Sequence, residues 1–478
     1  MTTDVARQLP VKAGWVLALM AGAQFMVVVD ETVVNVALPS MATDLHLNTS
    51  ELSWVVNAYL LLFGGFLLIA GRLADVMGRR RLFLLGLALF AIASAACGLA
   101  ENSATLTIAR AVQGLGAAFM SPTALSILTT TFHDPAGRRR ALAVWGALLG
   151  IGATAGVLLG GVIVEFLSWP WVFFINVPIA IGIAVGTVLI VPDSTGDSES
   201  KIDMLGAVVI TAACLLLVHT TVGLPDNGFA NPATIVGYLL TAALLAMFWF
   251  RQRRSANPLV ASEVTRSRTV RVADTAIAIT SAALFGTFFM VTLWMQLVQQ
   301  WTPLQSGLAW APQGVTVAIV SGLAARLMPI VGGRTLACLG FVIAAIAQLM
   351  LLRLDAAGSY LSQLLPALLI NAVGLGLVLV PLAVAAVDRI SSQNQGVASG
   401  LLSTAQQLGG AIGLAILVCL ATAVFNDRIA TGSGLPQASV ASFHAVFWVN
   451  AAALALVAAL SLLLPRLRQQ TDLAALVH

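Results

Sequence analysis

The sequence has very little charge: only 9% of its 478 residues are Asp, Glu, Lys or Arg, whereas hydrophobic types make up 59%. A soluble globular domain carries about 25% charged residues, so this composition excludes that class. Apolar runs of about 18 residues or more recur along the chain, and each is long enough to cross a hydrocarbon core as a helix. The alternating pattern of barrel strands is absent from these runs. The chain is therefore expected to be an all-α integral membrane protein.

Cysteine and histidine are also scarce. The 4 cysteines each lie within an apolar run, and the 5 histidines are scattered along the chain. This spacing predicts neither a disulfide framework nor a metal site. The sequence contains no phosphate-binding loop and no nucleophile elbow, which disfavours ATP-driven transport and catalysis. We therefore expect no metal, no cofactor and no enzymatic activity.

About fourteen apolar runs are predicted to span the membrane as helices. Basic residues cluster in the loops on one side, while the opposite loops hold only Arg353 and Arg428. Since basic residues are retained in the cytoplasm, both termini are expected on the cytoplasmic side. Arginine far exceeds lysine and alanine is abundant, a coding bias typical of bacteria with GC-rich DNA, so a bacterial inner membrane is expected. The expected helices cover 14–39, 51–70, 82–100, 104–131, 141–165, 170–191, 205–223, 233–250, 272–300, 306–328, 334–352, 360–387, 397–424 and 441–464.

Two of the basic loops resemble each other. The segment GRLADVMGRRRLFLLG begins at Gly71, and GLAARLMPIVGGRTLACLG, which begins at Gly322, looks like a weaker copy of it. Such a repeat predicts two six-helix halves with a site between them and a pair of inserted helices. The expected boundaries are 1–192 for the N-terminal half, 193–252 for a linker and the inserted helices, 253–271 for a basic cytoplasmic linker, and 272–478 for the C-terminal half and a short tail.

Three motifs carry a resemblance to a known family. They are Gly71, Asp75, Gly78 and Arg79 to Arg81 after the second predicted helix, DETVVNVALP from Asp30 in the first, and Arg110, Gln113, Gly114 and Gly116 in the fourth. Together they resemble the major facilitator superfamily, and within it the fourteen-helix drug:proton antiporter branch. The resemblance extends over essentially the whole chain. It implies export of small lipophilic or cationic drugs or antibiotics in exchange for protons, by alternating access.

The fifth predicted helix departs from the pattern of that branch. It reads GIGATAGVLLGG, with Val157 where the antiporter motif has proline. Gly152, Gly156, Gly160 and Gly161 remain, and glycines spaced by four residues let two helices approach closely. We therefore expect these glycines to serve in packing, while the bend that depends on proline is left unsupported.

Two adjacent carboxylates, Asp30 and Glu31, are the only ones well inside a predicted helix, and acids within a membrane are functional candidates. Asp30 matches the motif of the family, whereas Glu31 shares a helical stripe with Gln24 and Asn35. We expect Asp30 to carry the proton and Glu31 to be its partner or a contact for a cation. The alternative is that one of them only faces a wet cavity. Arg110 either tunes the helix-1 carboxylate or supports a packing interface.

A conformational latch is expected in the loop after the second helix. A carboxylate there can accept hydrogen bonds from a helix N-terminus, and arginines can pair with lipid phosphates. The latch residues are Gly71, Asp75, Gly78, Arg79 and Arg80.

The substrate cavity is expected to be lined by aromatic and amide side chains. Aromatic faces suit amphipathic ligands, and buried amides need partners. For each aromatic residue, packing in the core or against lipid is the alternative. The candidates are Gln24, Asn35, Trp54, Asn57, Gln113, Phe285, Phe289, Trp294, Gln296, Trp310, Gln313, Asn371 and Gln406.

The last five predicted helices contain no carboxylate near mid-span, which favours neutral or monocationic substrates over divalent cations. The expected partners are protons, small lipophilic or monocationic substrates and membrane lipids, without nucleic acid, and the chain is expected to act as a monomer. A lipid or metabolite transporter of the same fold is the nearest alternative, because a fold does not fix a function. A membrane-embedded enzyme or a receptor is a remote alternative.

Overall fold

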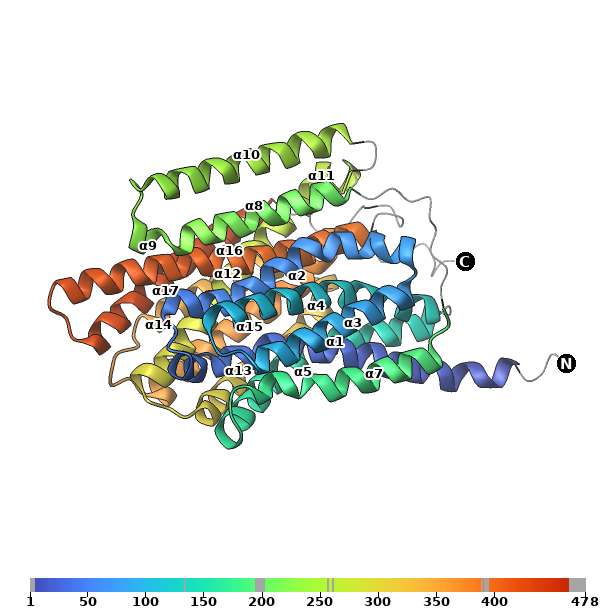
Figure 1. The fold of residues 1–478 in the computed structure, drawn as a ribbon, viewed down its shortest axis with the longest axis horizontal. Coiled ribbons are helices and arrows are strands. Elements are labelled where there is room, and N and C mark those ends of the chain that lie inside the picture. The colour runs from blue at the N-terminus through green and yellow to red at the C-terminus, as the bar shows by residue number, and fades with distance from the viewer. Residues whose placement is uncertain are drawn as a thin grey trace.

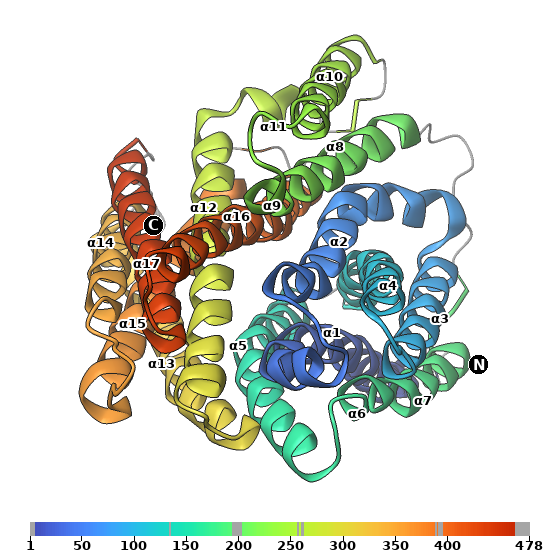
Figure 2. The same cartoon turned by 60° about the vertical axis from the view of Figure 1, so that its left-hand side comes forward.

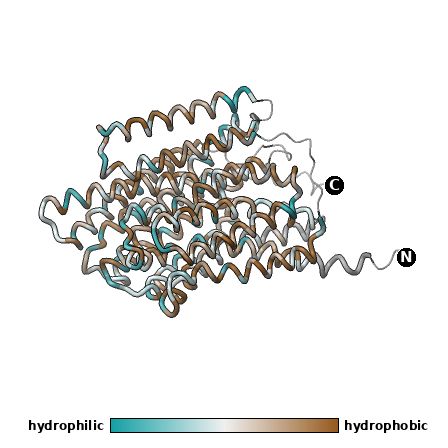
Figure 3. Tube along the Cα trace, viewed as in Figure 1, coloured by the Kyte–Doolittle hydropathy of each residue, from teal (hydrophilic) through white to brown (hydrophobic). Residues whose placement is uncertain are grey.

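A computed structural model describes residues 5–132, 135–193, 203–255, 258–259, 262–387, 390 and 395–463. Within these ranges every regular element is a helix, as the composition predicted. The long helices lie side by side in one bundle, and most of their length is apolar (Figures 1 and 3). The bundle has two groups of helices and a hairpin packed beside them.

The first group contains the N-terminal helices. α3 packs on α4, α4 on α2, and α1 on α5 (Figure 2). The helices are α1 (Val5–Asp44), α2 (Thr49–Met77), α3 (Arg79–Gly98), α4 (Ser103–Thr131), α5 (Pro135–Phe166), α6 (Trp171–Phe174) and α7 (Asn176–Ile190).

The second group contains the C-terminal helices. α12 packs on α16 and α17, and α14 packs on α15 and α17. The elements are α12 (Arg268–Leu293) with the π-helix η1 (Trp294–Val298), α13 (Pro303–Val331), α14 (Gly333–Leu351), the π-helix η2 (Tyr360–Leu364) with α15 (Leu365–Val387), α16 (Gln395–Ala430) and α17 (Leu435–Ser461).

A helical hairpin lies between the two groups in sequence and beside them in space (Figures 1 and 2). α8 contacts α2 and α16, while α10 packs on α8. Arg251 Nε donates a 2.7 Å hydrogen bond to Asp203 Oδ1, which ties the end of α10 to the start of α8. The elements are α8 (Met204–Val222), α9 (Leu224–Asn227), α10 (Pro232–Arg254) and α11 (Ser262–Arg266).

Twelve helices of the described chain are long and apolar enough to span a membrane. The other two predicted spans coincide with shorter apolar stretches, Ile151–Phe166 in α5 and Val208–Val222 in α8. One expected helix, 170–191, is broken into α6 and α7 at Ile175. Pro178 follows in the first turn of α7, where proline is tolerated because its missing N–H has no intrahelical partner there. The structure therefore has all fourteen expected helices but twelve clear spanning candidates.

The second helix of each group, α2 and α13, begins and ends with the same kind of cap. Asn48 before α2 and Thr302 before α13 each form a capping box with the third residue of the helix. Gly78 ends α2 with φ +89°, and Gly332 ends α13 with φ +90°. This backbone conformation favours glycine because it lacks a Cβ. The loops that looked like a strong and a weak copy thus share one geometry.

The two groups meet where glycines allow close contact, α2 on α16 and α5 on α13. A Cβ at Gly64 would lie 2.8 Å from Cβ of Gln407, and one at Gly307 would lie 2.7 Å from the carbonyl oxygen of Val157. Glycine therefore lets backbones from the two groups approach more closely than any larger residue would permit.

Candidate functional site

Asp30 is the centre of a buried polar network among the N-terminal helices. Arg110 Nη1 on α4 donates a 2.7 Å hydrogen bond to Asp30 Oδ2. Gln113 Nε2 and Asn176 Nδ2 both donate to Asp30 Oδ1 at 2.8 Å. The side chains of Asp30 and Arg110 are 0% and 1% exposed, so this is a fully buried ion pair. α1, α4 and α7 thus converge on one carboxylate.

Further groups hold the partners of Asp30 in position. Ser94 Oγ on α3 accepts from Gln113 at 3.2 Å and from Asn176 at 3.1 Å, and donates to the Phe173 carbonyl at 2.8 Å. Arg110 has two more acceptors, the Val55 carbonyl at 3.1 Å from Nε and Gln113 Oε1 at 2.7 Å from Nη1.

The aromatic ring of Tyr59 completes the surroundings of the guanidinium, whose Cζ lies 4.3 Å from the ring centroid. A cation over an aromatic face is attracted electrostatically. Arg110 therefore has favourable contacts from α2 and α4 besides its ion pair with Asp30. A buried charge pair with this many contacts can rearrange without leaving the cation wholly unpartnered.

Glu31 faces a different part of the molecule from Asp30. Its side chain is partly exposed and lies near buried Gln407 of α16. The two adjacent carboxylates thus look in two directions: Asp30 into the N-terminal helices, and Glu31 toward the boundary with the C-terminal helices.

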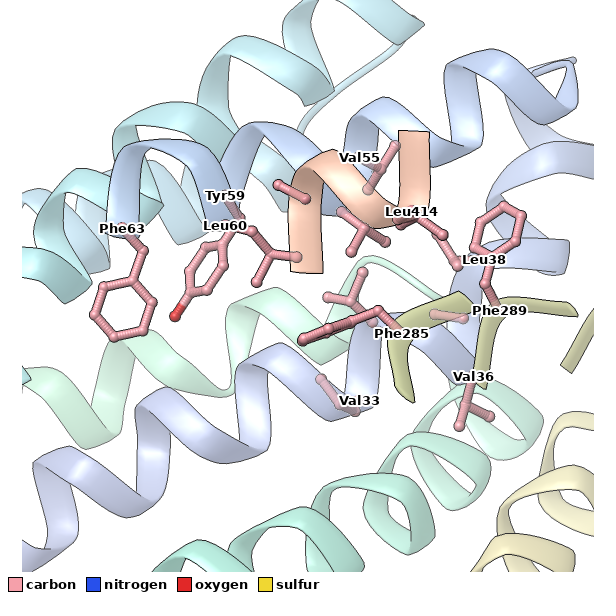
Figure 4. Close-up of a cluster of buried hydrophobic side chains, with 14 of the residues drawn as sticks. Val33, Val36, Leu38, Val55, Tyr59, Leu60, Phe63, Phe285, Phe289 and Leu414 are labelled. Atoms are coloured by element: carbon pink, nitrogen blue, oxygen red, sulfur yellow. The ribbon is translucent and has the colours of Figure 1, made fainter. Parts of the chain in front are cut away.

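A layer of apolar side chains fills that boundary (Figure 4). Val33 of α1 and Leu414 of α16 lie near Phe285 and Phe289 of α12, and Phe63 of α2 lies further along the same buried cluster. Phe285 and Phe289, which the sequence predicted for the cavity, therefore lie between the two groups of helices. This position fits an apolar substrate path and also fits plain core packing.

The predicted amide residues have diverse surroundings. Asn57 is wholly buried, and neither polar atom of its side chain has a partner among the described residues; Oε1 of buried Gln313 also has none. Gln296 Nε2 donates to the Val36 carbonyl at 3.0 Å and so links η1 to α1. Gln24 accepts from Ser121 Oγ of α4 at 2.7 Å. Asn35 donates to its own helix.

The three predicted tryptophans are not brought together. Trp54 lies in a groove with His219 of α8, with ring centroids 6.1 Å apart. Trp294 Nε1 donates to the Asp355 carbonyl at 3.0 Å. Trp310 Nε1 donates to Thr292 Oγ1 at 3.3 Å.

Asn371 belongs to a second buried network, among the C-terminal helices. Gln348 Nε2 donates to Asn371 Oδ1 at 3.5 Å, and Thr287 Oγ1 donates to Gln348 Oε1 at 3.0 Å. Asn450 Nδ2 donates to Thr287 Oγ1 at 3.2 Å and to the Ala283 carbonyl at 3.3 Å. Among the described residues, the groups that take part in it are amides, hydroxyls and a backbone carbonyl.

The predicted latch is described in part. The side chain of Asp75 and the surroundings of Gly71 lie outside the described features, whereas Gly78 adopts the positive φ given above. Arg79 is partly exposed, and Arg80 Nη2 donates to the Val188 carbonyl of α7 at 2.8 Å. The adjacent Arg81 forms an exposed salt bridge of 2.9 Å with Asp193. These arginines therefore tie α3 to the end of α7 and the segment after it.

The glycines of α5 lie where α5 packs on α1 and α13. A Cβ at Gly152 would meet Val28 at 2.9 Å, and one at Gly160 would meet Val33 at 2.9 Å. The glycines and their nearest neighbours are Gly152 with Val28, Gly156 with Thr32, Gly160 with Val33, and Gly161 with Leu304.

Several residues of the networks escaped the sequence analysis. Ser94 and Asn176 contact Gln113 or Asp30 but carry no recognised motif, and only their polarity within apolar runs could have indicated them. Of the two adjacent glutamines that the sequence offers for the cavity, Gln407 is buried and lies near Glu31, whereas Gln406 is partly exposed. Adjacent helical residues point about 100° apart, so the choice between the two glutamines required the tertiary structure.

Comparisons with known proteins agree with the motifs. The model of the Major Facilitator Superfamily matches residues 20–414. The chain is 34% identical to the puromycin resistance protein pur8 of Streptomyces alboniger, over 89% of this chain and 85% of that one. It is 38% identical to the cephamycin export protein CmcT of Amycolatopsis lactamdurans, over 95% and 93%. The fold is similar to that of an auto-inhibited POT family peptide transporter, with a TM-score of 0.68, 16% identity, and 96% and 98% of the two chains covered.

Proposed function

Because the chain belongs to the major facilitator superfamily, we propose that it is a proton-coupled antiporter that exports small lipophilic or cationic drugs or antibiotics by alternating access. Family membership confirms that it is a multi-pass membrane transporter and not an enzyme. Relatives named for antibiotic resistance and export support a drug as the cargo.

The buried network at Asp30 is the observation that carries the proposal. A proton that binds Asp30 neutralises the anion to which Arg110, Gln113 and Asn176 donate, and so weakens those hydrogen bonds. The guanidinium then keeps the Val55 carbonyl and Gln113 Oε1 as acceptors. Protonation would therefore change how α1 is held to α4 and α7, and such a two-state element is what alternating access requires.

Glu31 is assigned the contact with a cationic substrate. It is only partly buried and lies where α1 faces α16. A monocation that reaches this carboxylate would replace the amide of Gln407, while the apolar part of the compound would lie against Phe285 and Phe289. Asp30 and Glu31 would then serve proton and substrate separately, although they are adjacent in sequence.

The proposed architecture has fourteen spans. α5 packs against α1 and α13, and α8 against α2 and α10, so each lies beside helices that are themselves long and apolar enough to span. We assign residues 1–192 and 272–478 as the two halves, 193–252 as the linker and inserted pair, and 253–271 as a basic linker. An even number of spans and the one-sided arginine loops support two cytoplasmic termini in the bacterial inner membrane, with the protein acting as a monomer.

Proton release from the purified protein tests the proposal. The protein is placed in weakly buffered detergent with a pH-sensitive dye, and ethidium or puromycin is added. Wild type is measured beside Asp30→Asn and Glu31→Gln, with matched folding checked by size-exclusion chromatography. We expect release from wild type, none from Asp30→Asn, and release that requires more of the cation from Glu31→Gln.

The alternative outcomes are distinct. Proton release that persists in Asp30→Asn but is lost in Glu31→Gln would mean that Glu31, and not Asp30, carries the proton. No release with any cation from well-folded wild type would contradict cation/proton exchange and favour a neutral, lipid or metabolite cargo.

A further inference from the structure

α12 begins with two arginines on one side of the helix. Ser267 caps the helix by accepting from Val270 N–H. Arg268, Arg271 and Thr275 are exposed and share a stripe, because residues three and four apart lie on the same face. Val270 is buried on another face. It packs in a small cluster with Val264, Ile390 and Ala398. Packing of that inner face holds the arginines outward.

The two arginines line a groove between α12 and α17. The groove has a volume of about 220 Å³. Its other walls are Val272 and Thr275, one turn further along α12, and Leu460 near the end of α17. A cationic rim therefore adjoins apolar side chains, Val272 and Leu460, in the same groove.

Neither guanidinium is neutralised by the described part of the chain. The ion pairs found there are Arg81 with Asp193, Arg110 with Asp30, and Arg251 with Asp203. Asp274 lies close in sequence, but its Oδ1 has no hydrogen-bond partner among the described residues. Two positive charges thus border one groove without a paired carboxylate among the residues that the structure describes.

We propose that this groove binds an anionic phospholipid, with the phosphate held by Arg268 and Arg271 and an acyl chain lying along Val272 and Leu460. Guanidinium groups present paired donors that match a phosphate. Basic residues next to a span are attracted to the anionic lipids of the cytoplasmic leaflet. The assignment to that leaflet rests on the orientation proposed above, whereas the pairing of charge with an apolar wall does not.

The proposed lipid would join the two helices that frame the C-terminal group. α12 is the first and α17 the last helix of that group, and they also contact each other directly. A lipid bound between the ends of α12 and α17 makes contacts that are possible only in the folded protein. Ligands that bind only the folded state stabilise it, so the lipid should raise the melting temperature.

Lipid binding can be measured by native mass spectrometry on detergent-purified protein titrated with phosphatidylglycerol or phosphatidylcholine. The variants are the double substitution Arg268→Gln/Arg271→Gln, Leu460→Trp to fill the groove while keeping both charges, and Arg254→Gln as a matched loss of an exposed arginine elsewhere. Each arginine near an anionic surface is worth about fivefold in affinity, so the double variant should bind phosphatidylglycerol about 30-fold more weakly. Leu460→Trp should also weaken binding, and Arg254→Gln should not.

The inference would be overturned by equal phosphatidylglycerol affinity in the double variant and wild type, by an equal loss in Arg254→Gln, or by equal affinity for phosphatidylcholine. Binding of glycerol phosphate as tightly as the lipid would instead indicate a free-phosphate site and overturn the lipid assignment. If the double variant does not fold, unchanged phosphatidylglycerol affinity in Leu460→Trp overturns the inference and weaker affinity supports it. Cation-induced proton release is recorded on the same samples, so a failure of the antiport proposal shows there and leaves the lipid result intact.

Discussion

Gln113 of α4 and Asn371 of α15 occupy equivalent places in the two groups of helices. Each lies three residues before a glycine that packs against a glycine of the preceding long helix, Gly116 on Gly86 and Gly374 on Gly340. Ser94 lies eight residues after Gly86 and forms a hydrogen bond with Gln113. Gln348 lies eight residues after Gly340 and forms a hydrogen bond with Asn371.

The two equivalent networks differ in charge. Arg110, three residues before Gln113, corresponds to Leu368, three residues before Asn371. The C-terminal network therefore lacks the cation of the N-terminal one, and amides and hydroxyls do not change charge near neutral pH. The proposed proton site is thus confined to the N-terminal group, although the scaffold for such a site occurs twice.

Removing the charge of Asp30 should destabilise the protein because Arg110 then remains buried without its anion. Breaking a buried ion pair by removal of one partner typically costs about 3–5 kcal/mol. We expect Asp30→Asn to lower the melting temperature and to abolish proton release. The double variant Asp30→Asn/Arg110→Met should recover part of the melting temperature without recovering release. A double variant no more stable than the single one would contradict this view of the pair.

Gln113→Leu and Asn371→Leu make a matched comparison between the two networks. Each removes a buried amide and leaves its partners unsatisfied, which typically costs about 1–3 kcal/mol. Both variants should therefore melt earlier than wild type. Only Gln113→Leu should also change the pH dependence of cation-induced proton release, because only that amide contacts Asp30. Equal changes in both pH profiles would argue against a proton site in one group alone.

Gly161→Ala should separate α5 from α13. The added Cβ would lie 2.9 Å from Leu304 Cα and from the Pro303 carbonyl oxygen, which are backbone atoms that cannot rotate away. Gly182→Ala is the control, since a Cβ there meets nothing within 4 Å. We expect Gly161→Ala to slow export of ethidium from proteoliposomes and to lower stability, whereas Gly182→Ala should match wild type. Equal transport by all three proteins would show that this contact is not critical.

Asn57→Leu should leave stability unchanged or raise it. The amide is fully buried without a partner among the described residues, and replacing an unsatisfied polar group by an apolar one removes a desolvation cost. If this amide gains a partner when the two groups of helices separate, export should slow while the melting temperature holds. A marked fall in melting temperature would indicate a hydrogen bond in the protein that the structure does not contain.

The sequence alone was enough to predict the class, the helices and the family. Apolar helices leave a local signal in the sequence, so all fourteen expected helices were found, and twelve of them are long and apolar enough to span a membrane. Asp30 and Arg110 could be singled out because a charge within such a run is costly and rare. The glycines of α5 were visible through their spacing alone.

Only the tertiary structure decided which side chains meet. Asp30 and Asn176 are 146 positions apart, and nothing along the chain indicates that they share a hydrogen bond. The neighbours that Asp30 and Glu31 each meet depend on how α1 is rotated against the other helices, which packing and not periodicity determines. The groove at Arg268 likewise exists only because the start of α12 lies beside the end of α17, and contacts between distant segments leave no local pattern in a single sequence.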